Sequence, residues 1–168
     1  MNAVLYGPVF QTAYIVADMS AAIDSLSRRF GISQFLRTPG AVTLTPGDAE
    51  PMQVELGLAF VGATMIELIR PAGGADAVYR SHVPSSAGAL RFHHLAFRLW
   101  NERQWTDMLV DARDQGYRVV MSGEQNNTRF LYLDTREELG HYTEYLFYID
   151  PPRTSLPRIP QNLAMLPD

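Results

Sequence analysis

The stretch Arg91-Phe-His-His-Leu-Ala-Phe-Arg-Leu99 decides the fold of this chain. It is short, apolar and aromatic, a composition that is typical of a buried β-strand. Side chains alternate between the two faces of a strand, so His94 should share a face with Ala96 and Arg98. His93 should then point to the opposite face, which we expect to pack in the core beneath a helix.

A helix pattern follows this strand directly, and the same order of elements occurs near the N-terminus. Apolar residues recur at helical spacing over 102–115, after a strand at 91–99. Residues 10–16 read as a strand and residues 20–30 as a helix, with Ser20 as its expected N-cap. Since the two stretches align residue by residue, the chain uses one strand–helix unit twice.

Each half continues into three further predicted strands. In the first half, two Thr-Pro-Gly turn signals flank a short strand, and a hairpin follows over 54–60 and 64–69. In the second half, strands are predicted at 117–121, 130–134 and 141–149. The pattern predicts an α+β fold of two tandem βαβββ modules. The expected division is a first module at 1–74, a connecting helix and loop at 75–90, a second module at 91–150 and a proline-rich tail at 151–168.

The tail differs in composition from the two modules. Its prolines should prevent regular helix or sheet, which leaves an extended chain. Leu156, Ile159 and Leu163 are nevertheless apolar. We therefore expect the tail to pack on the body of the protein or on a neighbouring chain.

Composition narrows the classes of function. With 168 residues, of which 46% are hydrophobic, the chain can bury the core of one domain or of two small modules packed together. A net charge of −4 without a basic stripe argues against a nucleic-acid partner. The absence of cysteine excludes disulfides, thiolate metal sites and cysteine nucleophiles. No apolar run reaches membrane-spanning length, and no secretory signal is visible, so we expect a cytoplasmic protein without a membrane partner.

Four polar residues occupy equivalent places in the two halves. Gln11 and His94 lie on the first strands, while Glu67 and Glu144 lie within the apolar last strands. A carboxylate inside an apolar strand is costly to bury without a partner. Taken singly, such a histidine or glutamate is more often a satisfied polar residue than a ligand. Two halves that face each other would bring all four together, and this set of donors suits a divalent cation.

The segments Leu58–Pro71 and Phe92–Phe97 carry a family resemblance. Over residues 9–149 the sequence resembles the vicinal oxygen chelate superfamily, which includes glyoxalase I, methylmalonyl-CoA epimerase, extradiol dioxygenases and bleomycin-resistance proteins. The likeness is greatest to the epimerase-like and glyoxalase-like branch. It implies two βαβββ modules that form a cupped mixed sheet around one divalent metal ion, which could be Zn, Ni, Co or Mn. The family ligands fall on Gln11, Glu67, His94 and Glu144.

The resemblance implies a metal-dependent isomerase, epimerase or lyase that acts on a small carbonyl-containing substrate through a metal-stabilised enolate. A single imidazole with two carboxylates favours Lewis-acid chemistry over activation of oxygen. Glu144 and Glu67 are the candidate bases. Arg98, on the face of His94, is a candidate for holding an anionic substrate, and Tyr142, on the face of Glu144, for lining the pocket.

Two alternatives of other classes stay open. A ring-cleaving dioxygenase of the extradiol type would require iron and would consume oxygen. A metal-free binding protein of the bleomycin-resistance type would bind a small molecule without catalysis, although such proteins typically lack the ligand set. The sequence leaves the oligomeric state open, with a homodimer as one alternative.

Overall fold

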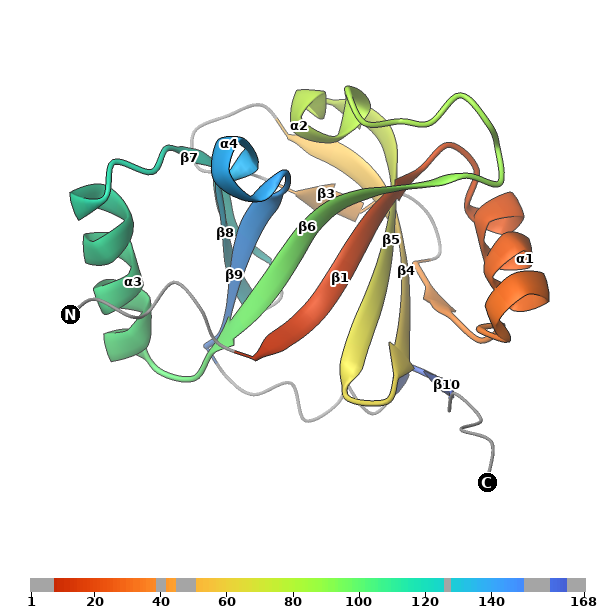
Figure 1. The fold of residues 1–168 in the computed structure, drawn as a ribbon, viewed down its shortest axis with the longest axis horizontal. Helices are drawn as coiled ribbons and strands as arrows, with labels where there is room; N and C mark the ends of the chain where they lie inside the picture. The colour runs from red at the N-terminus through yellow and green to blue at the C-terminus, as the bar shows by residue number, and fades with distance from the viewer. Residues whose placement is uncertain (1–7, 39–41, 45–50, 126–127, 150–157, 163–168) are drawn as a thin grey trace.

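The computed structural model describes residues 8–38, 42–44, 51–125, 128–149 and 158–162. These residues form one curled mixed sheet with helices around its outside (Figure 1). The strands are β1 Val9–Val16, β2 Leu36–Arg37, β3 Val42–Leu44, β4 Met52–Val61, β5 Thr64–Gly74, β6 Leu90–Leu99, β7 Val119–Gln125, β8 Thr128–Leu133, β9 Tyr142–Tyr148 and β10 Gln161–Asn162. The helices are α1 Met19–Phe30, α2 Ala77–Arg80, α3 Glu102–Asp114 and α4 Arg136–Leu139.

The sheet is built from two modules of the same plan. Its strand order is β10-β4-β5-β1-β6-β9-β8-β7, with β2 and β3 both paired to β4. In each module the first strand lies parallel to the last, β1 beside β5 and β6 beside β9. The modules join where β1 and β6 pair antiparallel through the middle of the sheet (Figure 1). The predicted α+β class, with two tandem modules and a cupped mixed sheet, is confirmed.

Each long helix begins at a side-chain cap. Asn101 caps α3 as predicted, because its Oδ1 accepts a hydrogen bond from the backbone N–H of Gln104 at 2.9 Å. In α1 the cap is Asp18, whose Oδ1 accepts from the N–H of Ala21 at 2.8 Å. The prediction of Ser20 as the N-cap of α1 is wrong, since the carboxylate two residues earlier starts the helix.

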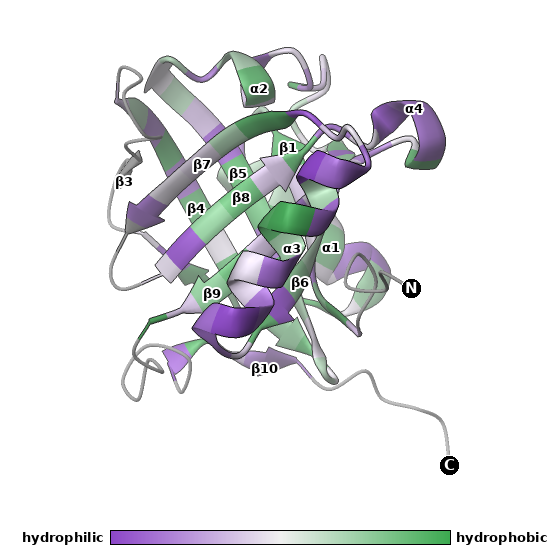
Figure 2. Ribbon diagram, turned by 90° about the vertical axis from the view of Figure 1, so that its left-hand side faces the viewer, coloured by the Kyte–Doolittle hydropathy of each residue, from purple (hydrophilic) through white to green (hydrophobic). Residues whose placement is uncertain are grey.

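The two long helices, α1 and α3, cover the outside of the cup. Leu26 of α1 packs with Val16 and Leu68 of the first module. Met108 and Ala112 of α3 pack on the outer face of the second module. Figure 2, in which α3 lies in front of the sheet, shows this helix carrying both hydrophobic and hydrophilic residues. The apolar contacts hold each helix to the convex side, so the opposite faces of the central strands line the interior.

Two β-bulges interrupt the pairing of β1 with β6, one in each strand. Phe10 is the extra residue in β1, between the pairs Val9↔Phe97 and Gln11↔Ala96. His93 is the extra residue in β6, where the register shifts from Tyr14↔Phe92 to Ala13↔His94. A bulge breaks the alternation of faces.

The bulge in β6 corrects the expected orientation of His93. Its ring lies beside that of Tyr142, with centroids 4.8 Å apart, and its Nδ1 lies 2.9 Å from Nδ1 of His94. The prediction that His93 faces the helix side is wrong, because the extra residue turns both histidines to the inside of the cup.

The described part of the C-terminal tail, residues 158–162, packs on the first module, which is one of the two predicted alternatives. β10 lies parallel to the end of β4, and Ile159 is buried. The expectation that the prolines exclude all regular structure is wrong for Gln161–Asn162, which follow Pro160 and are free to pair. Leu156 and Leu163 lie outside the described residues. In the described part of the chain, no helix has the length and apolar character needed to cross a membrane.

Candidate metal centre

Four side chains meet inside the cup, one from each of the four central strands. Glu67 on β5, His94 on β6 and Glu144 on β9 offer ligand atoms that all lie within 4.8 Å of one another. His94 Nε2 lies 3.1 Å from Glu144 Oε2 and 3.6 Å from Glu67 Oε2. Gln11 on β1 donates its Nε2–H to Glu67 Oε2 at 2.5 Å. The structure therefore brings together all four residues that the sequence singles out, two from each module.

Strand register explains why these residues converge. Ala13 on β1 lies directly between Glu67 on β5 and His94 on β6. Ala96 on β6 lies directly between Gln11 on β1 and Glu144 on β9. Both alanines are fully buried. Because each bears a single methyl group, the long side chains on either side of it can lean over it and meet.

Burial dominates the electrostatics of the site. Burial and the neighbouring charge of Glu144 raise the pKa of Glu67 well above its usual value. Burial raises the pKa of Glu144 to about 8, against a hydrogen bond from Tyr132 that lowers it. Burial lowers the pKa of His94 to about 3, so its imidazole is neutral at pH 7. The cluster thus holds two buried carboxyl groups without a cationic partner among the described residues.

Two atoms of the cluster lack the hydrogen bonds that buried polar atoms require. His94 Nε2 and Glu144 Oε2 are both buried, and neither has a hydrogen-bond partner in the described part of the chain. A divalent cation would accept lone pairs from both atoms. Its charge would also balance the two carboxylates, while Gln11 can add an amide oxygen. The donor set therefore fits a divalent metal ion held by Gln11, Glu67, His94 and Glu144.

Two tyrosines that sequence reasoning did not select stand behind Glu144. Tyr132 on β8 lies directly opposite Glu144 in the register and donates a hydrogen bond to its carboxylate. The hydroxyl of Tyr79 on α2 donates to that of Tyr132 at 3.2 Å. Both rings are buried. The sequence shows Tyr132 only as a tyrosine within an apolar strand. Its pairing with Glu144 follows from the register of β8 against β9, which the sequence does not specify.

The two predicted substrate-binding residues lie on strands that carry ligands, Arg98 on β6 and Tyr142 on β9, where Tyr142 is paired with His94. The Arg98 guanidinium carbon lies 4.1 Å from the ring centroid of Trp100 and 4.6 Å from that of Tyr148. Its Nε is buried and has no partner among the described residues. The ring of Tyr142 packs on His93 and beneath the guanidinium of Arg136. Their roles in binding substrate stay predictions.

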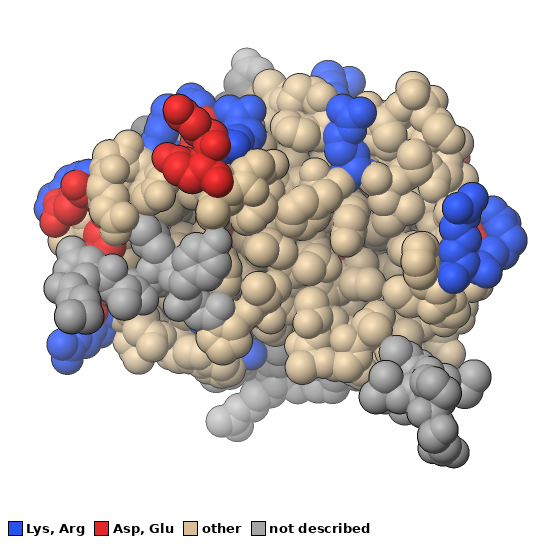
Figure 3. All heavy atoms as spheres, viewed as in Figure 1, with Lys and Arg blue, Asp and Glu red and all other residues tan. Residues whose placement is uncertain are grey.

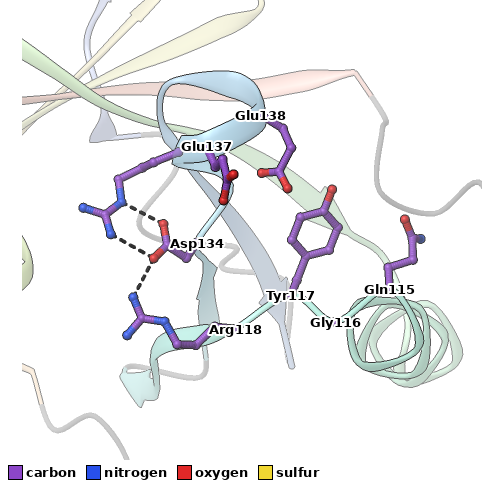
Figure 4. Close-up of a pocket in the computed structure, with 8 residues that line it drawn as sticks. Gln115, Gly116, Tyr117, Arg118, Asp134, Glu137 and Glu138 are labelled. Atoms are coloured by element: carbon purple, nitrogen blue, oxygen red, sulfur yellow. Dashed lines mark hydrogen bonds and ion pairs between the residues drawn. The ribbon is translucent and has the colours of Figure 1, made fainter.

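A hollow of about 540 Å³ on the surface lies elsewhere, between the end of α3 and α4 (Figure 4). At its rim Asp134 accepts hydrogen bonds from Arg118 at 2.6 Å and from Arg136 at 2.7 and 2.8 Å. The hollow shares no lining residue with the four ligands. Figure 3, viewed from the same side as Figure 1, shows charged side chains mostly near the edges of this face of the molecule and a largely uncharged middle. We interpret the ion pairs at the rim of this hollow as structural, and we do not assign the hollow a binding role.

Comparison with solved structures supports the fold. Methylmalonyl-CoA epimerase from Mycobacterium tuberculosis aligns with a TM-score of 0.54 and 18% identity, over 88% of this chain and 91% of the other. A Streptomyces coelicolor methylmalonyl-CoA epimerase variant in complex with 2-nitronate-propionyl-CoA aligns with a TM-score of 0.56 and 17% identity, over 84% and 94%. A hypothetical protein from Bacillus halodurans aligns with a TM-score of 0.55 and 16% identity, over 83% and 92%.

Sequence comparison places the chain in a family. No curated protein matches it significantly. Residues 10–132, more than half of the chain, match the glyoxalase/bleomycin resistance protein/dioxygenase superfamily. This match agrees with the resemblance read from the segments Leu58–Pro71 and Phe92–Phe97. The protein belongs to the glyoxalase/bleomycin resistance protein/dioxygenase superfamily.

Proposed function

We propose that this protein is a metal-dependent isomerase, epimerase or lyase that removes a proton beside the carbonyl group of a small substrate. The observation that carries the proposal is the convergence of Glu67, His94 and Glu144, with Gln11, inside the cup. Two buried carboxylates next to a neutral imidazole form a site that can hold a divalent cation and still present a base.

Each residue of the cluster has a part in this chemistry. A divalent cation, when bound here, supplies the positive charge that makes a proton beside a carbonyl group more acidic. Glu144 takes that proton onto its carboxylate. Glu67 on β5, whose ligand oxygen lies within 4.8 Å of that of Glu144, can return a proton. Exchange of the proton between two carbon positions, or between two faces of one carbon, gives isomerisation or epimerisation.

The similar structures help to choose the compounds to test. Several are epimerases of methylmalonyl-CoA, and one was solved with methylmalonyl-CoA and NH4+. At 17% and 18% identity this likeness concerns the fold alone, so it leaves the substrate of this chain open. Acyl thioesters therefore belong in a panel of carbonyl compounds, beside small 2-oxo acids and hydroxyketones.

We also propose that Arg98 holds an anionic group of the substrate. It lies on the strand of His94, and no carboxylate among the described residues pairs with it. Stacking between Trp100 and Tyr148 fixes the guanidinium while its Nε stays unpartnered. Wild-type protein should prefer 2-oxo acids over neutral hydroxyketones, and Arg98→Met should lose this preference. An equal preference in Arg98→Met would contradict the role of Arg98.

Hydrogen exchange in deuterated water tests the reaction class. Metal-loaded protein should incorporate deuterium beside the carbonyl group of at least one compound in the panel. Glu144→Gln should lose this exchange while keeping its fold. Glu124→Gln, which changes an exposed glutamate of β7, should keep the wild-type rate. If iron-loaded protein instead consumes oxygen with a catechol, the isomerase proposal is wrong and a ring-cleaving dioxygenase takes its place.

A further inference from the structure

His93 links the backbone of α2 to the histidine of the proposed metal centre. Its Nε2 lies 3.1 Å from the carbonyl oxygen of Val78, which belongs to α2. Its Nδ1 lies 2.9 Å from Nδ1 of His94. The ring is 1% exposed and lies against the rings of Tyr79 and Tyr142, so it is held in this orientation.

The Val78 carbonyl fixes where the protons of this chain of hydrogen bonds lie. A carbonyl oxygen can only accept, so His93 must carry its proton on Nε2. The Nδ1 of the neutral His93 ring is then an acceptor, and the proton between the two rings must come from Nδ1 of His94. This leaves the Nε2 lone pair of His94 free, and Nε2 is the atom that faces Glu67 and Glu144.

The carbonyl oxygen of Val78 can accept the hydrogen bond from His93 although a second histidine also donates to it. The ring of His82 also donates a hydrogen bond to the Val78 carbonyl. A carbonyl oxygen has two lone pairs, so both histidines can donate to it at once. His82 is therefore outside the chain that runs from Val78 through His93 to His94.

The first module offers an internal contrast. Its bulge residue, Phe10, occupies the place that His93 has in the second module, and the residue after it is Gln11. A glutamine amide has no tautomers and needs no partner to select one. A histidine ligand has two, and only one of them presents Nε2. His93, which can form hydrogen bonds, thus precedes the histidine ligand His94. Phe10, which has an apolar ring, precedes Gln11, whose amide needs no such partner.

We propose that His93 is a positioning residue, which selects the Nδ1–H tautomer of His94 and so keeps Nε2 free for a divalent cation. It acts through His94 and does not itself touch the proposed cation or the substrate. The inference rests on the proposed metal centre and names the residue that prepares its imidazole ligand. Groups that hold a histidine ligand in this way typically change metal affinity about 10- to 100-fold when they are removed.

Nitrogen-15 NMR of the metal-free protein tests this assignment without any substrate. The chain has 4 histidines, so a protein labelled only in histidine gives a simple spectrum. The chemical shifts and long-range proton couplings should show His93 as the Nε2–H tautomer and His94 as the Nδ1–H tautomer. A wild-type spectrum in which His94 carries its proton on Nε2 would overturn the inference.

Three variants separate positioning from simple packing. His93→Gln can accept through Oε1 and donate through Nε2, so it should keep the His94 tautomer and bind Zn²⁺ nearly as the wild type does. His93→Leu should lose the tautomer preference and about 10- to 100-fold in Zn²⁺ affinity, measured by competition with a chelating dye. His82→Phe should change neither. Equal loss in His93→Gln and His93→Leu would show that only the size or ring of His93 matters.

These results are distinguishable from a failure of the proposed function. If the His94 tautomer and the Zn²⁺ affinity follow His93 but no compound exchanges deuterium, the positioning role stands and the reaction class is wrong. If deuterium exchange occurs and His94 is the Nε2–H tautomer in the metal-free protein, the reaction class stands and the role of His93 is wrong.

Discussion

Tyr132 supports the proposed ligand Glu144 through its hydroxyl group. It donates a hydrogen bond to that carboxylate and receives one from Tyr79. Tyr132→Phe keeps the ring and removes the donor, so the Glu144 carboxylate loses a stabilising partner. We expect metal affinity to fall by about tenfold or more, and the free energy of unfolding by about 1–2 kcal/mol. Metal titration and chemical denaturation measure the two effects.

Tyr79→Phe is the matched control for that change. It removes the hydroxyl of Tyr79 but leaves the bond from Tyr132 to Glu144 in place. Its effect on metal affinity should therefore be clearly smaller than that of Tyr132→Phe. If the two variants lose the same affinity, the hydrogen bond to Glu144 is not what matters, and the prediction fails.

The sequence predicted the four proposed ligands but not the residues that support them. Gln11, Glu67, His94 and Glu144 could be chosen because an internal repeat placed them in equivalent strands, and alternation gave each the same face. His93 was misplaced because a bulge adds one residue to a strand and leaves no mark in an apolar pattern. The support roles depend on register and hydrogen bonding between distant elements, which alternation within one strand does not specify.

Among the elements, β10 should contribute stability through a single side chain. Asn162 Oδ1 accepts hydrogen bonds from the N–H groups of Ser33 and Gln34, and its Nδ2 donates to the carbonyl of Gln34. Asn162→Ala removes these three bonds from a site that is 8% exposed. We expect the free energy of unfolding to fall by about 2–3 kcal/mol, as measured by chemical denaturation.

Gln161→Ala supplies the comparison within the same strand. The side chain of Gln161 is exposed and makes one hydrogen bond, to the carbonyl of Gly62. Its loss should cost less than about 1 kcal/mol. If Asn162→Ala is no more destabilising than Gln161→Ala, the tail does not hold the loop that follows α1.

The ion pairs that join α4 to the second module should make its stability depend on pH. Hydrogen bonds from Arg136 and then Arg118 hold the pKa of Asp134 below its usual value of 3.8. The folded state therefore favours the carboxylate, and this stabilisation is present above about pH 4 and lost as the pH falls through the folded pKa. Asp134→Asn should be destabilised by about 0.5–1 kcal/mol at pH 7, because both arginines are partly exposed.

A pair of denaturation series tests this dependence. The difference in unfolding free energy between wild type and Asp134→Asn should shrink as the pH is lowered from 7 to about 2. Glu138→Gln, which lies in the same hollow, should differ little from wild type at any pH. A difference for Asp134→Asn that stays constant with pH would mean that packing, not charge, accounts for it.

The helix that connects the modules supports both sides of the proposed metal centre. Two adjacent residues of α2 end the two chains of hydrogen bonds, the carbonyl of Val78 behind His94 and the hydroxyl of Tyr79 behind Glu144. The sequence predicted a short helix here from local pattern alone. It could not assign this role, because the contacts join α2 to strands that lie far from it in the chain.

At the scale of the whole molecule, the proposed centre joins the two modules. Gln11 and Glu67 come from the first module, and His94 and Glu144 come from the second. The modules also meet along the antiparallel pair β1 with β6 and in a shared core, which includes Ile15 of the first module and Leu146 of the second. A cation that binds all four side chains would therefore cross-link the halves in the folded state and have no such site in the unfolded chain.

Metal should accordingly stabilise the entire fold. A cation present at about 100 times its dissociation constant adds about 2.7 kcal/mol to the free energy of unfolding. For a chain of this size we expect the melting temperature to rise by roughly 5–10 °C. Calorimetry of chelator-treated protein, with and without added Zn²⁺, Ni²⁺, Co²⁺ or Mn²⁺, measures the shift. Elemental analysis should find about one ion per chain.

Variants of the carboxylates locate the effect. Glu144→Gln and Glu67→Gln each replace one carboxylate by a neutral amide, which relieves the repulsion between the two carboxylates and weakens the binding of a divalent cation. Both should melt at or above the temperature of the metal-free wild type, and both should show a smaller rise on adding metal than the wild type does. Glu124→Gln should keep the full response, because this glutamate is exposed on β7. An equal response in Glu144→Gln would show that the Glu144 carboxylate does not hold the bound ion, and this assignment would then be wrong.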